Sequence, residues 1–440
     1  MHIRTNDRLM KQSSPDIDKL AGIEYYTTEF DGIGGTIKKN TEDFHVQEII
    51  SNIFLNQITP DQTTSNIFPV YEIRKKGMDS SHAILTLRKK TGLDLKIVGI
   101  KDAKATTIQY ASSSSSSSST RKTIKNIDLG KIKLTLVGFS RKPIEKNNLV
   151  GNTFDIRIVE PKRDKLGNIS QFLRDINRLG NYYGLQRFGS ERLVTHLVGK
   201  AILERKFDKA IEILLTYTTK YDSKFSREIR EKLKDIKSNP NLIHEIPPGM
   251  DIEKNLAQAI LKGKDPISVL RTIPINIRRL FVQAFQAYLF NKTLSIAIRN
   301  DFSLTVPEEN DLCFDVFADE LIFGKIRKYE KEKPTDSRIL RLPIIRLPGY
   351  SFQPGKNRFD KIIKEFMKYE NIAAKDFFIK EMQELSESGG FRQACYICKN
   401  FSYIREENSL SVGFSVPKGS YATVLLRELI KPANPIESGF

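Results

Sequence analysis

The sequence predicts a mixed α/β protein, in the wider sense that includes α+β folds, built from two parts. The chain has 440 residues, which is long for one ordinary core, so two domains or one domain with a large insertion are expected. Strand and helix patterns mix through about residue 190, and from about 191 to 300 the pattern is helical. Strand and helix return near the C-terminus, which therefore resembles the first half more than the middle.

Strands in the first half are indicated by alternation of apolar and polar side chains. They are expected at TIKKN (36–40), DFHVQEII (43–50), VYEIRKK (70–76), KIKLTLVGF (131–139) and TFDIRIVE (153–160). Helices are expected at DSSHAILTLRKKTG (79–92) and NISQFLRDINRLG (168–180). Asp79 or Ser80 can cap the first of these helices and Gly92 can end it. Between the two helices, a short apolar strand at 97–98 leads into Lys101-Asp102, and eight serines follow at 112–119. The serine run is expected in an exposed loop.

The charge of the chain predicts a polyanionic partner. Lysine and arginine exceed aspartate and glutamate by 71 − 53 = 18, and such an excess favours nucleic acid through phosphate contacts. No run of about 18 apolar residues indicates a membrane span, and the first 19 residues lack the apolar core of a signal peptide. We therefore expect nucleic acid as the partner, no membrane, and a cytoplasmic protein.

The three cysteines exclude a disulfide framework and fit a reducing compartment. Cys395 and Cys398 form a CxxC, which could be half of a zinc site, but no second CxxC or HxxxH is present among the five histidines. The sequence also lacks GxxxxGK[ST], GxGxxG after a strand, HExxH and GxSxG, which argues against nucleotide hydrolysis and zinc proteolysis. We expect two ordinary thiols and no metal.

Three segments are candidates for chemistry, and each has a plain structural alternative. NYYGLQRFGS (181–190) combines rings, an amide and an arginine, which suits a nucleobase, although its rings could simply be core residues. TEDFHVQEI (41–49) offers carboxylates for acid–base work, or solvated charges on a strand. In GIKDAK (99–104), Asp102 follows an apolar strand, and the flanking lysines would keep it ionised or bind phosphate. The alternative is a turn.

Taken together and in order, six segments resemble successive motifs of one family, the TruD tRNA pseudouridine synthases, and of its archaeal members in particular. These segments are KKNTEDFHVQEI, GIKDAKATTIQYAS, NYYGLQRFG, THLVGKAIL, FVQAFQAYLFN and FSVPKGSYATVLLREL. The resemblance covers roughly residues 34–430. It implies an isomerase that converts uridine to pseudouridine in tRNA, most commonly uridine 13, without a cofactor.

The resemblance also implies an organisation. A pseudouridine synthase catalytic domain, with a mixed or antiparallel sheet flanked by helices, would be interrupted by a large α-rich insertion. We expect a flexible tail at 1–30, the catalytic domain at 31–199 and 396–440, and the insertion at 200–395. A monomer is expected, with no protein partner.

The site residues implied by the resemblance come from the matching motifs. Asp102 matches the catalytic aspartate, and Lys38 matches a basic residue that would pair with it. The expected substrate-binding residues are Asn181, Tyr183, Tyr421 and Glu42. Two rival functions remain open, which are a catalytically silent RNA-binding protein on the same scaffold and a zinc-using RNA enzyme built on the CxxC.

Overall fold

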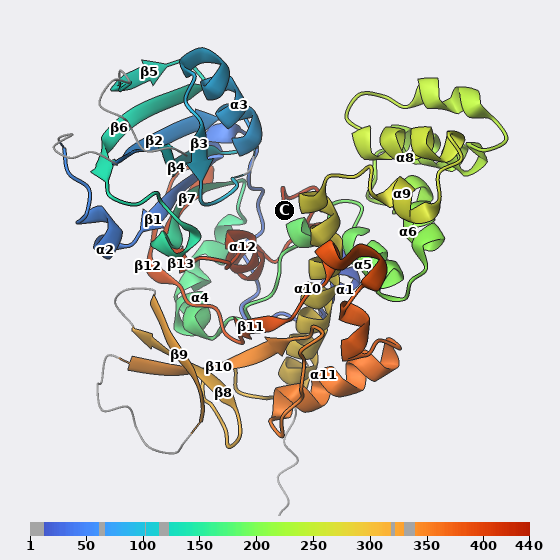
Figure 1. Cartoon of the computed structure of the whole chain (residues 1–440). Coiled ribbons are helices and arrows are strands. Elements are labelled where there is room, and N and C mark those ends of the chain that lie inside the picture. Colours follow the sequence, from blue (N-terminus) through green and yellow to red (C-terminus); the bar gives the residue numbers. More distant parts are fainter. Residues whose placement is uncertain (1–12, 61–66, 102, 114–122, 318–321, 330–338) are drawn as a thin grey trace, which may run out of the picture.

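The first and last parts of the chain build one mixed sheet. The computed structural model describes residues 13–60, 67–101, 103–113, 123–317, 322–329 and 339–440. Nine strands in these ranges share a sheet: β1 (Phe44–Ile50), β2 (Phe68–Lys76), β3 (Leu95–Ile97), β4 (Thr106–Ser113), β5 (Asn126–Asp128), β6 (Ile132–Ser140), β7 (Leu149–Val159), β12 (Lys399–Arg405) and β13 (Ser409–Pro417). Their order is β12-β13-β7-β1-β4-β2-β6-β5, with β3 paired to β4 (Figure 1). Only β1 and β4 run parallel among the described pairs of this sheet.

Helices flank this sheet, and local sequence signals set their ends. Helix α3 (Ser80–Thr91) begins after Asp79, whose carboxylate accepts hydrogen bonds from the backbone N–H groups of Ser81 and His82. It ends at Gly92, which adopts φ 71° and so tolerates the left-handed cap. The other helices packed near the sheet are α2 (Asn52–Leu55), α4 (Ile169–Asp175) and α12 (Ala422–Ile430). The predicted α/β class is confirmed.

One face of the sheet is apolar towards both edges and polar in the middle. On the β2 side, Tyr71 and Ile73 pack with α3 in one core cluster. On the β13 side, Phe154 and Phe414 stack with ring centroids 5.4 Å apart, in the cluster that contains α12. Between these regions the same face carries four buried polar side chains, namely Glu48, Lys75, Thr107 and Gln109. Polar groups buried at the centre of a sheet face need a reason beyond packing.

The middle of the chain contains helices and a second sheet. The helices are α5 (Thr195–Leu203), α6 (Phe207–Thr216), α7 (Lys224–Lys232), α8 (Asp251–Leu261), α9 (Pro266–Leu270), α10 (Ile275–Arg299) and α11 (Arg358–Tyr369). The strands β8 (Leu312–Phe317), β9 (Ile322–Lys328), β10 (Ile339–Leu347) and β11 (Gly390–Gln393) pair in the order β11-β10-β8-β9. The predicted helical region at 191–300 is confirmed. None of the described helices is both long and apolar enough to cross a membrane, and this includes α10, which is buried on most sides.

The expected N-terminal tail needs correction where it is described. Residues 13–30 are packed into the main core, and Ile17, Ile23 and Phe30 are each at most 1% exposed. This segment includes the short helix α1 (Asp16–Leu20). It lies between α10 and α12, since Asn291 of α10 donates to the Ala21 carbonyl and α12 binds the Thr27 and Thr28 amides through Glu428. Its polar composition suggested a tail, but its few apolar residues complete the core.

The serine run also begins inside the fold. Ser112 and Ser113 are the last residues of β4 and are buried, whereas an exposed loop was expected for the whole run. Ser112 accepts a hydrogen bond from the Ile144 amide, which satisfies its hydroxyl oxygen. The serines at 114–119 lie outside the described residues.

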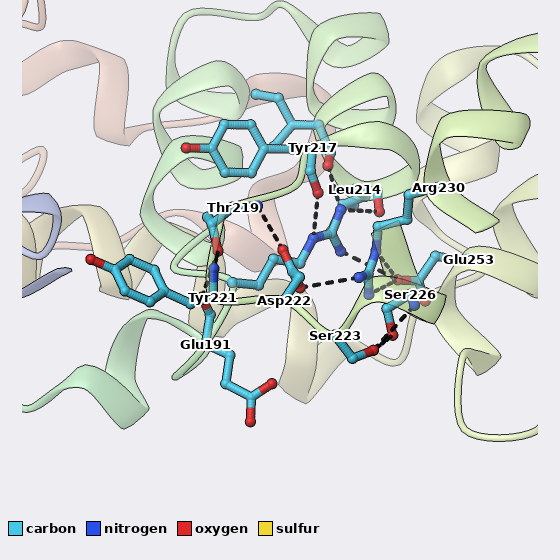
Figure 2. A network of polar contacts seen from close by, with 12 residues as sticks. Glu191, Leu214, Tyr217, Thr219, Tyr221, Asp222, Ser223, Ser226, Arg230 and Glu253 are labelled. Carbon is cyan, nitrogen blue, oxygen red and sulfur yellow. Dashed lines mark hydrogen bonds and ion pairs between the residues drawn. The ribbon is translucent and has the colours of Figure 1, made fainter. Parts of the chain in front are cut away.

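A buried ionic network fixes the helical region to the segment that follows NYYGLQRFGS (Figure 2). The Arg230 guanidinium contacts Glu253 at 2.9 Å and Asp222 at 3.2 Å. Arg192 contacts the same Glu253 oxygen at 3.2 Å and donates to three backbone carbonyls at the end of α6. Every charge in this network has a partner, so the network orders α6, α7 and α8 around residues 191–193.

His196 makes the stability of the fold depend on pH. It lies on α5, 5% exposed, stacked on Tyr288 with ring centroids 5.0 Å apart, and its Nδ1 has no hydrogen-bond partner. Burial lowers the pKa of this imidazole to about 3, from 6.5. The unfolded chain therefore binds a proton below about pH 6.5 that the folded protein does not, so stability decreases as pH falls from there towards 3.

A His196→Phe variant is expected to lose less stability in acid than the wild type. Between pH 7 and pH 5, the free energy of unfolding of the wild type should fall by roughly 2 kcal/mol more than that of the variant. Denaturant titrations of both proteins at several pH values measure this difference. Parallel pH profiles would show that His196 is not the group responsible.

Candidate active site

Two tyrosines from distant motifs lie beside each other. The ring centroids of Tyr183 and Tyr421 are 6.0 Å apart, with planes at 63°, and Tyr183 also meets the ring of Phe290 edge-on at 5.5 Å. Gly184 allows this approach, because a Cβ atom there would lie 3.3 Å from the Tyr421 ring and 3.0 Å from Thr423 Oγ1. Both tyrosines are only partly buried. The exposed part of such rings is the kind of surface on which a nucleobase can stack.

Arg392, at the end of β11, holds the two tyrosine-bearing loops together. Its Nε and Nη2 donate to the Asn181 carbonyl and to the Asn181 side-chain oxygen, both at 2.9 Å. Nη2 also reaches the Tyr182 carbonyl at 3.2 Å, and Nη1 donates to the Gly419 carbonyl at 2.9 Å. The guanidinium carbon lies 4.0 Å from the Tyr183 ring centroid, a cation–π contact. Arg392 is 9% exposed, so it acts from beneath the site.

Asn181 is fully engaged within the protein. It is 1% exposed, and its amide nitrogen donates to the backbone and side-chain oxygens of Gln393, both at 3.3 Å. Its side-chain oxygen accepts from Arg392, and its backbone N–H donates to the Ala394 carbonyl at 3.0 Å. Asn181 therefore positions the loop that carries Tyr183, because the nitrogen and the oxygen of its amide already have partners within the protein.

Lys101, the residue before Asp102, forms a buried ion pair with Glu48. The Nζ atom of Lys101 lies 2.8 Å from Glu48 Oε1, and the two side chains are 9% and 0% exposed. The second Glu48 oxygen accepts from the Tyr110 N–H at 2.8 Å. Lys101 was expected to keep Asp102 ionised or to bind phosphate, but its ammonium is paired with Glu48. Asp102 itself lies outside the described residues.

The backbone of Lys101 is held as well as its side chain. Its N–H donates to Ser80 Oγ at 3.0 Å, and its carbonyl accepts from Lys75 Nζ at 3.4 Å. The Ser80 hydroxyl in turn donates to Gln109 Oε1 at 3.0 Å. Lys75, Ser80 and Gln109 are each at most 1% exposed. Side chains from β2, α3 and β4 therefore converge on the peptide that leads to Asp102, which explains the polar centre of the sheet face.

The structure places Lys38 and Glu42 just before β1. Lys38 adopts φ 56°, and its Nζ lies 4.8 Å from the centroid of Phe44, a residue on the same sheet face as Glu48. Glu42 is exposed and forms an ion pair with Lys76 of β2. The hydrogen bond from Lys76, followed by one from Thr41, lowers the pKa of Glu42 to about 2. Their expected roles beside Asp102 and the substrate stay predictions.

The Lys101–Glu48 ion pair and the Tyr183–Tyr421 ring pair lie at the same end of the sheet. Glu48 is directly opposite Asn152 on β7, and Asn152 is directly opposite Val416 on β13. Adjacent strands are about 4.8 Å apart, so Glu48 and Val416 are separated by roughly 10 Å. The strand β13 ends one residue after Val416, and the turn that follows carries Tyr421. Lys101, which contacts Glu48, and Tyr421, which follows β13, are therefore at the same end of the sheet.

Three buried polar atoms around these groups have no hydrogen-bond partner in the described structure: Thr107 Oγ1, Asn152 Oδ1 and Thr423 Oγ1. Thr107 lies opposite Lys75, Asn152 lies opposite Glu48, and Thr423 follows Tyr421. Buried polar atoms are normally satisfied by protein, water or ligand.

The CxxC cysteines are part of the core. Cys395 and Cys398 are buried, and desolvation raises the pKa of each thiol to about 12. The part of the chain that the structure describes has no group of three or more His, Cys, Asp or Glu side chains able to hold a metal ion. Thiols with such a pKa stay protonated at neutral pH, which does not suit a metal ligand or a nucleophile.

Several residues of the site were missed by reasoning from the sequence. Arg392 has no local signal, because Asn181 is 211 positions earlier in the chain and Gly419 is 27 positions later. Lys75 looked like one of two basic residues at the end of a strand, and only the alternation of β2, which points Tyr71, Ile73 and Lys75 to one face, could have indicated that it is buried.

A pair of half-buried rings, a buried polar sheet face and a net charge of +18 together fit the class of nucleic-acid-binding proteins. The family model for tRNA pseudouridine synthase D (TruD) matches residues 20–429. The chain belongs to the TruD family.

Relatives support this assignment over the whole length. A protein from Archaeoglobus fulgidus, named a probable tRNA pseudouridine synthase D, is 30% identical and aligns over 94% of this chain and 99% of its own. One of the same name from Pyrococcus abyssi is 30% identical over 92% and 98% of the two chains. A crystal structure assigned to tRNA pseudouridine synthase D from Methanosarcina mazei superposes with a TM-score of 0.73 at 27% identity, covering 96% and 99% of the two chains.

Proposed function

We propose that the protein isomerises uridine to pseudouridine in tRNA, at uridine 13, with Asp102 as the catalytic carboxylate and no cofactor. One observation carries this proposal: the Tyr183–Tyr421 pair, fixed by Arg392, lies at the same end of the sheet as the tethered Lys101. Asp102 is the next residue in the chain. A stacking platform for a base and a carboxylate for the ribose would then face one substrate nucleotide.

The proposed reaction breaks the bond between uracil N1 and ribose C1′, turns the base, and joins its C5 to C1′. Asp102 would either attack C1′ or remove the proton from C2′, and Lys38 would keep its carboxyl ionised. The detached uracil must stay in place while it turns. The rings of Tyr183 and Tyr421 would retain it by stacking, with Asn181 holding their loop.

The organisation expected from the resemblance forms part of the proposal. We assign residues 31–199 and 396–440 to the catalytic domain and 200–395 to the insertion. The strands of the nine-stranded sheet all fall in the first set and those of the four-stranded sheet in the second, which supports this division. Glu42 would contact the substrate, and the lysine-rich and arginine-rich surface would bind the tRNA backbone. The enzyme would act in the cytoplasm as a monomer, without a protein partner.

The wild-type protein is expected to introduce one pseudouridine into unmodified tRNA. Incubation followed by base-specific chemical labelling and mapping locates the product, and a tRNA with cytidine at position 13 serves as the matched control that should remain unmodified. Tight tRNA binding without any product would instead favour the silent RNA-binding protein. Product at another uridine would keep the isomerase and reject the target position.

A further inference from the structure

In the three residues before Asp102, the side chain of Lys101 points inward and that of Ile100 points outward. Lys101 is anchored to Glu48 by its ammonium and to Ser80 by its backbone N–H. Gly99 has no room for a side chain, since a Cβ atom would lie 2.7 Å from Glu48 Oε1 and 2.8 Å from Lys101 Nζ. Between them, Ile100 is directed to solvent and is 80% exposed.

Ile100 is the most exposed isoleucine of the described ranges, followed by Ile53 at 72% and Ile404 at 69%. Among the large apolar side chains of the described ranges, only Tyr369, at 81%, is as exposed as Ile100. The described residues that flank this stretch, Val98 and Ala105, are 8% and 0% exposed, whereas Ala103 and Lys104 are exposed like Ile100. An isoleucine in water has an unfavourable apolar surface that a binding partner could cover.

The position of Ile100 relative to the proposed catalytic group follows from the covalent chain. One residue, Lys101, separates it from Asp102, so the chain allows a Cα–Cα distance of at most about 7 Å between them. The spacing between stacked bases is about 3.4 Å, so a side chain at this distance reaches a base next to the one whose ribose meets Asp102. Lys104, on the other side of Asp102, is also exposed and can contact phosphate.

We propose that Ile100 enters the RNA beside the target uridine and fills the space that this nucleotide leaves when it is flipped out. Proteins that open nucleic acid stacks often insert an apolar side chain between bases, and a base must leave the stack before an enzyme can act on it. The anchored Lys101 keeps Ile100 pointing outward, so little conformational entropy is lost on insertion. This inference rests on the proposed function, because it assigns Ile100 a step in that reaction.

The test compares Ile100→Ala with the wild type on two RNAs. On folded tRNA, single-turnover formation of pseudouridine should fall by about 10-fold or more, a loss of the size expected when a side chain helps to open the stack. Binding, which depends mainly on phosphate contacts, should change by less than about twofold. On a short single-stranded RNA with the target uridine already unstacked, the two proteins should be equally fast, and Ile100→Leu should retain activity on both.

The matched control is Ile404→Ala, which removes an isoleucine that is 69% exposed on β12, at the edge of the sheet. Equal rates for the two alanine variants on folded tRNA, or an equal loss on single-stranded RNA, would overturn the proposal. A tRNA carrying 2-aminopurine next to the target uridine separates this question from catalysis. Its fluorescence should rise when the wild type opens the stack and not with Ile100→Ala, even if no pseudouridine were formed by either protein.

Discussion

An Asp102→Asn variant is expected to bind unmodified tRNA as tightly as the wild type and to form pseudouridine at least about 1000-fold more slowly. Asparagine keeps the size of the side chain but can neither attack C1′ nor accept the C2′ proton. Because the substitution changes only one charge of the protein, the phosphate contacts that dominate affinity should persist. Single-turnover rates measured by chemical mapping, together with filter-binding isotherms, separate the two effects.

The control for this variant is Asp94→Asn, which alters an exposed aspartate that lies 4.0 Å from Arg88, shortly before β3. Its rate should match that of the wild type. If Asp102→Asn retained full activity, Asp102 could not be the catalytic carboxylate, whereas the fold and the family would be unaffected. A parallel loss of tRNA binding would mean that Asp102 acts in recognition.

The second large effect is expected for Glu48→Gln. The change leaves the ammonium of Lys101, whose side chain is 9% exposed, without its buried counter-charge. Removing one partner of a buried ion pair typically costs about 3–5 kcal/mol. Chemical denaturation should therefore show a large loss in the free energy of unfolding. Pseudouridine formation should fall as well, since the peptide that leads to Asp102 loses one of its anchors.

A surface pair provides the comparison. Glu160→Gln breaks the exposed contact between Glu160 and Lys39, and such pairs contribute less than about 1 kcal/mol. Replacing both members of the buried pair, in a Glu48→Gln/Lys101→Met double variant, should recover part of the stability because no buried charge remains. Activity should stay low if the pair positions Asp102. The interpretation would be wrong if Glu48→Gln were as stable as Glu160→Gln.

Local features of the fold could be predicted because their causes are local. The cap at Asp79, the end of α3 at Gly92 and the alternation of β1 and β7 each depend on a few adjacent residues. The pairing of β13 with β7 joins residues about 250 positions apart, and periodicity carries no information about such partners. The ordered segment at 13–30 was missed for the same reason, since its stability comes from α10 and α12.

The site shows the same division. Resemblance to a family gave Asn181, Tyr183 and Tyr421, and the structure brings these three together around one arginine. The resemblance could not predict Arg392 or the pairing of Lys101 with Glu48. Charged residues are common in this chain, and only their burial in the fold shows which of them form the site. Lys101 was noticed for its position beside Asp102, but its partner depended on how β3 and β4 pack against β1.

The place of Arg392 in the chain limits how the protein can be reduced or recombined. It belongs to the stretch assigned to the insertion, yet it binds the loop of Asn181 and the turn of Gly419 directly. An engineered minimal enzyme that kept only residues 31–199 and 396–440 would lose the guanidinium beneath Tyr183. Chimeras between relatives should therefore exchange β11 together with both tyrosine loops, as one inherited unit.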